Sequence, residues 1–144
     1  MYNRFLHIHD GLRWLILVVF VITLVKYLAG WLGSQPWKKM DNMLGLVLTS
    51  LMDLQLIVGV ILYFFLSPVT RLAMSDLRGA MKDPDLRFYA IEHLVMMLVA
   101  VVLVHIGRAK SKKAVTDSGK FKTGTIYLLI AFVVILMAIP WNRL

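Results

Sequence analysis

The segment from Arg87 to Arg108, RFYAIEHLVMMLVAVVLVHIGR, constrains the fold most, because it is almost wholly apolar over a length that can cross a membrane. A helix rises about 1.5 Å per residue and needs about 20 apolar residues to span the hydrocarbon core. The segment nevertheless carries Glu92, His93 and His105. Ionisable groups inside a membrane helix are costly and usually serve a function. We therefore predict a transmembrane helix in which His93 binds a ligand.

Three more apolar segments share this character. The predicted helices span residues 4–27, 42–66, 87–107 and 123–142, and polar links with glycine, proline and charged residues separate them. With 60% hydrophobic residues in 144 and a mean hydropathy of +0.77, no room remains for a soluble domain. Strands are a poor alternative because the runs are long and do not alternate. The chain is predicted to be a single all-α domain, an integral membrane four-helix up-down bundle in a lipid bilayer.

The net charge of +8 does not indicate nucleic-acid binding, because the basic residues lie between apolar segments. The links at 28–41 and 108–122, with Lys26, hold nine Lys and Arg residues, and the opposite side holds seven. The positive-inside rule then places the nine on the cytoplasmic side and both termini on the outer side of a bacterial inner membrane.

His7, His9 and Asp10 interrupt the first segment, so no cleavable signal peptide is predicted. The absence of cysteine excludes disulfides, thiolate-held iron–sulfur clusters and covalently attached haem.

Histidines lie near the start of the first and third predicted helices. These two helices start on the same side of an up-down bundle. His9 lies roughly 7 Å along the axis from Arg4, and His93 lies roughly 9 Å from Arg87. These helices can face each other diagonally, as a planar macrocycle with one imidazole on each face requires. His7 and His9 point to nearly opposite sides of their helix, so only one is expected to meet His93. The deeper His9 is favoured, with His7 as the alternative.

Other residues at this depth fit such a cofactor. Gly59 lies roughly 10 Å back from Leu66 on the second helix and would leave space for a flat ring, although a close helix contact explains it equally well. Arg13 and Arg87 lie on the same outer side and are candidates to pair with the propionates of a haem. Ordinary interfacial anchoring is the alternative for each arginine.

His105 and Asp53 are harder to assign. His105 lies about 18 Å along the helix from His93, with no second histidine near it. A second haem would need Met40 or Met43 as a ligand, so one haem per chain is favoured and His105 is expected to hydrogen-bond a neighbour. Asp53 lies near mid-membrane, where it would be protonated, paired with another helix or in a wet cavity. Proton transfer and quinone binding are candidate uses, beside a structural hydrogen bond.

Four stretches carry a family resemblance: LHIHDGLRW, LQLIVGVILYF, RFYAIEHLVMML and HIGRAKSKKA. Through them the chain resembles the small four-helix cytochrome b proteins of Bacteroidetes-type bacteria, and it is more broadly similar to membrane cytochromes of the b561 kind. The resemblance implies a non-covalent haem b held by His93 and by His9 or His7. It also implies electron transport, with quinone or a larger respiratory or redox complex as the partner. The b561 kind typically holds two haems with histidine pairs on both sides, whereas here the inner side has only His105.

Two other functions stay open at this stage. The chain could be a cofactor-free accessory or assembly subunit of a larger membrane complex. It could also hold a non-haem metal ion, because His7, His9, Glu92 and His93 offer nitrogen and oxygen donors. No P-loop, zincin motif or nucleophile–base pair is present, so hydrolysis and phosphoryl transfer have no support. An electron-transfer protein or redox subunit is therefore expected, rather than a stand-alone enzyme.

Overall fold

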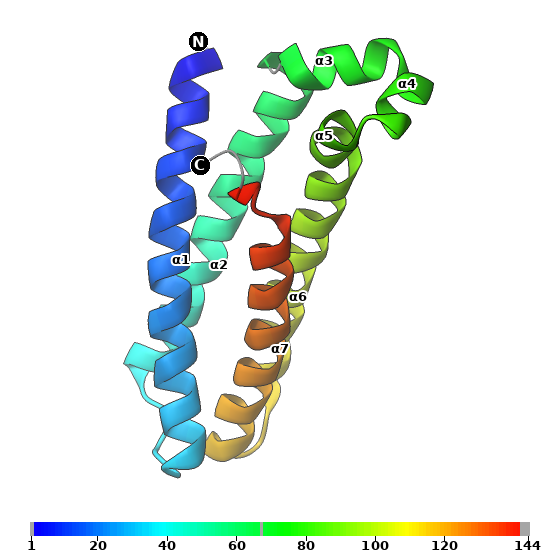
Figure 1. Cartoon of the computed structure of the whole chain (residues 1–144). Coiled ribbons are helices and arrows are strands. Elements are labelled where there is room, and N and C mark those ends of the chain that lie inside the picture. Colours follow the sequence, from blue (N-terminus) through cyan, green and yellow to red (C-terminus); the bar gives the residue numbers. More distant parts are fainter. Residues whose placement is uncertain (1, 67, 142–144) are drawn as a thin grey trace.

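The computed structural model describes residues 2–66 and 68–141, and it confirms an all-α four-helix membrane bundle (Figure 1). Each of four helices is long and apolar enough to cross a membrane. They alternate in direction along the chain, so the described ends of the chain lie at the same end of the bundle (Figure 1). The four are α1 (Tyr2–Leu32), α2 (Lys39–Ile61) with its π-helical continuation η1 (Leu62–Leu66), α6 (His93–Lys113) and α7 (Asp117–Ala138).

The link between the second and third spanning helices is itself helical. It consists of α3 (Pro68–Ser75), α4 (Leu77–Lys82), α5 (Pro84–Arg87) and the π-helical turn η2 (Phe88–Glu92), which leads into α6. Its first two helices are divided at Asp76. The Asp76 carboxylate accepts a hydrogen bond from the Gly79 backbone N–H at 3.0 Å and so caps α4 as a new helix. Asp83 caps α5 in the same way, with Pro84 at its first position.

The spanning helices differ from the predicted ranges mainly at their polar ends. The first continues from residue 27 to Leu32, and the last begins at Asp117 instead of residue 123 because Thr116 caps it. Hydropathy marks the part of a helix inside the hydrocarbon, but hydrogen bonding lets the helix continue beyond it. The last helix ends at Ala138 because Pro140 forces an extended conformation on the residue before it. The predicted end at residue 142, and Arg143 in the charge count, lie outside the described residues.

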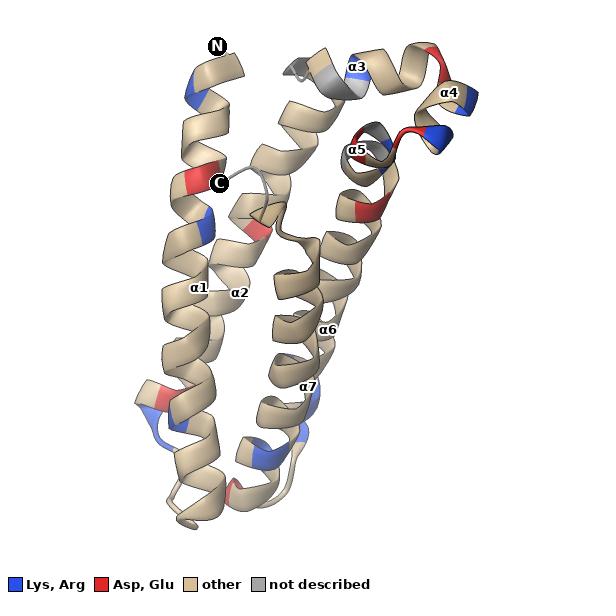
Figure 2. Cartoon of the chain, viewed as in Figure 1, with Lys and Arg blue, Asp and Glu red and all other residues tan. Residues whose placement is uncertain are grey.

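Packing places α1 diagonally opposite α6. Both pack against the same two neighbours, α2 and α7. Most charged residues lie near the two ends of the bundle (Figure 2), as a membrane-spanning protein requires. The largest side chains that are fully buried in the core are Phe20, Leu48, Met52, Val104 and Phe121.

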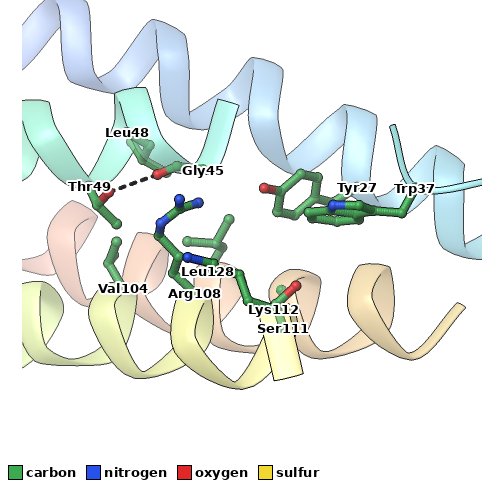
Figure 3. A pocket seen from close by; sticks show the side chains of 11 residues that line it. Tyr27, Trp37, Gly45, Leu48, Thr49, Val104, Arg108, Ser111, Lys112 and Leu128 are labelled. Carbon is green, nitrogen blue, oxygen red and sulfur yellow. Dashed lines mark hydrogen bonds between the residues drawn. The ribbon is translucent and has the colours of Figure 1, made fainter. Parts of the chain in front are cut away.

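The end of the bundle that carries the links 33–38 and 114–116 is tightly closed. A pocket of only about 10 Å³ lies there among Tyr27, Trp37 and Arg108 (Figure 3). Trp37 and Phe121 stack with ring centres 4.9 Å apart, and the Arg108 guanidinium donates to the Asn42 carbonyl at 3.2 Å. We call this part the closed end.

Candidate functional site

A cavity of about 660 Å³ lies between the four helices toward the opposite end, which we call the open end. This volume lies within the range of sites that hold large organic ligands. Most of its wall is apolar, and the few polar groups include two imidazoles, a guanidinium and an amide. Its apolar lining comes from all four helices and includes Leu6, Ile16, Leu17, Met52, Leu56, Val60, Leu62, Leu94, Met97, Val101, Ile135 and Ile139.

Two histidines face each other across this cavity. The ring centres of His9 on α1 and His93 on α6 are 6.2 Å apart, with 55° between the ring planes. An imidazole nitrogen binds a metal ion at about 2.0 Å, so two imidazoles on opposite sides of one ion have ring centres roughly 6.3 Å apart. The angle between the planes is compatible, because each ring can rotate about its metal–nitrogen axis. The distance between the ring centres is therefore compatible with both imidazoles binding one metal ion.

The orientation of His93 is set by the end of α7. His93 Nδ1 lies 2.8 Å from the carbonyl oxygen of Ala138, the last residue of that helix. Carbonyls at a helix C-terminus lack partners within the helix, so this one can accept a hydrogen bond from the Nδ1–H of the imidazole. With its proton on Nδ1, His93 keeps the lone pair of Nε2 for a metal. Backbone carbonyls commonly hold ligating histidines in this way.

His9 is positioned by α2. The buried Gln55 side chain donates to the His9 backbone carbonyl at 2.8 Å and ties α1 to α2 at this level. Gly59 lies one turn further along α2, and a Cβ atom at this position would be 3.6 Å from His9 Nε2. Glycine thus leaves space beside the nitrogen that a metal would use. Gln55 was not among the predicted site residues, although its spacing of four from Gly59 places both on one helix face.

Arg13 brings a positive charge to the cavity wall. Its side chain is only 14% exposed, and its Nη1 lies 3.5 Å from the Asp10 carboxylate. Within residues 2–66 and 68–141, Arg13 Nε and Gln55 Oε1 are buried and have no hydrogen-bond partner. A buried polar group without a partner is costly. Both atoms therefore suit a ligand with its own polar groups, and a carboxylate would complement Arg13.

The other candidate residues lie away from this cavity. His7 is exposed on α1, so His9 and not His7 is the residue that meets His93. Arg87 does not line the cavity and instead pairs with Glu92 at 2.7 Å. His105 hydrogen-bonds Asp53 on α2, with Nε2 and Oδ1 2.6 Å apart. Neither Met40 nor Met43 is buried, and both lie outside the cavity.

The four donors considered for a non-haem metal ion, His7, His9, Glu92 and His93, are not brought together as one group. In the described part of the chain, no three His, Asp or Glu side chains are grouped so that they could hold a metal ion. Glu92 is engaged with Arg87, and His7 points away. Two opposed imidazoles alone suit a metal whose remaining donors come with a larger ligand.

Comparison with known proteins adds no further assignment. No protein-family model, curated protein or solved structure matches the chain. The function therefore has to be inferred from the residues and geometry of the chain itself.

Proposed function

We propose that the chain is an integral membrane protein that binds one haem b between His9 and His93 and carries electrons. The observation that carries this proposal is the 6.2 Å spacing of two imidazoles across an apolar cavity of about 660 Å³. A porphyrin provides four nitrogen donors in a plane and leaves two axial positions. The chain offers two histidines for those positions, and the apolar wall suits the flat face of the macrocycle.

Bound haem supplies reversible one-electron chemistry at its iron. The chain would hold the two ligand imidazoles in place. His93 is oriented by the Ala138 carbonyl, whereas His9 is oriented by the packing of α1 on α2. With His9 and His93 both as ligands, bound haem would supply electron transfer rather than catalysis at the iron.

Arg13 is the residue we propose for the haem carboxylates. It lies one turn from His9 on α1, lines the cavity and has a buried Nε without a hydrogen-bond partner within the described ranges. Charge-assisted bonds between a guanidinium and a carboxylate are among the stronger polar contacts in proteins. Arg87, the other arginine candidate, is already paired with Glu92.

The proposed setting is a bacterial inner membrane. The closed end carries the basic links and would face the cytoplasm, and the open end would face outward together with the N-terminus. The haem would then lie near the outer surface. A membrane quinone or a larger redox complex is the proposed electron partner.

An optical spectrum of the purified protein tests this function. Protein made with haem available is expected to show a sharp b-type α-band in the reduced-minus-oxidised spectrum. A pyridine haemochrome assay should give about one haem per chain. His9→Ala and His93→Ala should each abolish the native spectrum, because each removes one of the two protein ligands. His7→Ala is the matched control and should keep it.

Two results would contradict the proposal. A flat spectrum with haem available would favour the accessory-subunit alternative. A full spectrum in the His9→Ala and His93→Ala variants would place any haem elsewhere in the chain.

A further inference from the structure

A second polar site lies on the outer surface of the bundle, where α2 meets α6. Asp53 Oδ1 and His105 Nε2 are 2.6 Å apart, and their side chains are 47% and 48% exposed. The side chains one turn away on each helix, Ile57 and Val102, are also exposed and are apolar. The pair is therefore a polar spot on a surface that otherwise suits lipid.

The depth of this pair limits what can reach it. Asp53 is the fifteenth residue of the 27-residue span Lys39–Phe65, and His105 is the thirteenth of the 21-residue span His93–Lys113. Asp53 lies near the middle of the membrane, whereas His105 lies three residues before Arg108, closer to the basic end of α6. Ionisable residues within the membrane usually face the protein interior or a wet cavity, and exposing them to lipid alone is costly. A partner must therefore be soluble in the hydrocarbon and carry polar groups of its own.

The pair still has hydrogen-bonding capacity to offer. In the described part of the chain, His105 Nδ1 and Asp53 Oδ2 have no hydrogen-bond partner. When both ring nitrogens of His105 are protonated, Nδ1–H can donate to a carbonyl, and the Asp53 carboxylate balances the charge. The free oxygen of Asp53 can accept from a hydroxyl. The pair thus suits a molecule whose oxidised form carries carbonyl groups and whose reduced form carries hydroxyl groups.

The pair also lies close to the cavity. Met52, the neighbour of Asp53, lines the cavity, and so does Val101, one turn from His105 on α6. A ligand on Asp53 and His105 would therefore lie on the lipid side of the same helices that enclose the proposed haem site.

We infer that Asp53 and His105 form a binding site for the headgroup of a membrane quinone, which enters from the lipid between α2 and α6. His105 donates to a quinone carbonyl, and Asp53 accepts from a quinol hydroxyl. The inference rests on the proposed function, because a membrane quinone is the electron partner proposed there. Binding itself needs only the two side chains.

Photolabelling in lipid nanodiscs tests the site. The probe is an azido derivative of a short-chain 1,4-naphthoquinone, and unlabelled naphthoquinone competes with it. Saturable labelling is expected on the segments of α2 and α6 that carry the pair. The double variant Asp53→Leu/His105→Leu should weaken binding roughly tenfold or more. Asp53→Asn/His105→Gln keeps polar side chains of similar size and should retain part of the binding.

Thermal unfolding checks that the variants fold, and apolar replacement of both partners should not destabilise the helices. The double variant His9→Ala/His93→Ala separates the two proposals, since it should lose haem but keep the labelling. Haem in the wild type without saturable labelling overturns the quinone site alone. Labelling without haem overturns the proposed function alone.

Equal labelling of the wild type and of Asp53→Leu/His105→Leu would also overturn the site. The same conclusion would follow if this variant only converted a dimer to monomers, because the pair would then serve contact with a second copy of the chain.

Discussion

The two ends of the bundle use glycine in opposite ways. At the closed end, aromatic side chains occupy the space beside Gly30, Gly107 and Gly124. A Cβ atom on Gly30 would lie 2.5 Å from the Phe121 ring, and one on Gly107 would lie 2.4 Å from Tyr127 Cβ. At the open end, a Cβ on Gly59 would meet His9 at 3.6 Å, which is an ordinary contact distance. Glycine therefore allows close packing at one end and leaves space for a ligand at the other.

Charge differs between the ends in a similar way. At the closed end the carboxylate of Asp41, which is 1% exposed, pairs with Lys26 at 2.7 Å and also accepts from the Lys38 backbone N–H. At the open end the Arg13 guanidinium, also largely buried, keeps an Nε atom without a hydrogen-bond partner in the described residues. Thr125 Oγ1, toward the closed end, is also buried without a hydrogen-bond partner among the described residues, but Arg13 and Gln55 are the ones that line the cavity of about 660 Å³.

A larger side chain beside His9 at the open end should have the largest effect on haem binding. Gly59→Leu places a branched side chain against His9 Nε2, so haem binding is expected to be lost while the apoprotein unfolds at nearly the same temperature. Haem content by pyridine haemochrome and a thermal melt measure the two effects. Gly11→Leu is the matched control, because a Cβ there has no neighbour within 4 Å. Normal haem content in Gly59→Leu would show that the space beside His9 is not used.

Removing a large core side chain at the closed end should mainly reduce the stability of the fold. Phe121 is fully buried against Gly30 and Trp37, so Phe121→Ala leaves a hole. The expected cost is about 3 kcal/mol, measured by reversible unfolding in detergent. Leu129→Ala on the same helix removes a side chain that is 52% exposed and should cost much less. Equal losses in the two variants would show that the closed end is not tightly packed.

A smaller effect is expected from the charge in the cavity. Arg13→Gln should weaken haem binding by roughly tenfold, because a charge-assisted bond to a haem carboxylate is lost. Both axial ligands remain, so the α-band should stay. Titration of haem into the apoprotein measures the affinity. Arg87→Gln is the control, since Arg87 pairs with Glu92 outside the cavity. A larger loss in Arg87→Gln than in Arg13→Gln would reverse this assignment.

The smallest effect should come from one methyl group. Gly59→Ala adds a carbon at 3.6 Å from His9 Nε2, a distance at which only slight adjustment is needed. Haem affinity should fall by less than the roughly tenfold expected of a lost charged contact, again measured by titration. The same change at the closed end, Gly107→Ala, should instead lower the melting temperature, because Tyr127 has no space to move. Similar behaviour of the two variants would remove the contrast between the ends.

The sequence by itself determined what depends on length and position along a helix. Four apolar runs of membrane-spanning length predict four helices, and short links predict alternating directions. The rise of about 1.5 Å per residue places His9 and His93 at similar depths. Helix ends were less predictable, because capping by Thr116, Asp76 and Asp83 moves them away from the hydropathy boundaries.

Only the tertiary structure decided what depends on rotation about the helix axes. The packing of α1 on α2 and α7 turns His9 and Arg13 inward and His7 outward. The Ala138 carbonyl meets His93 because Pro140 ends α7 at that level. His105 and Asp53 are 52 residues apart in sequence and meet only because α2 and α6 are neighbours. Periodicity gives relative angles within one helix, but only packing between helices sets which face turns inward.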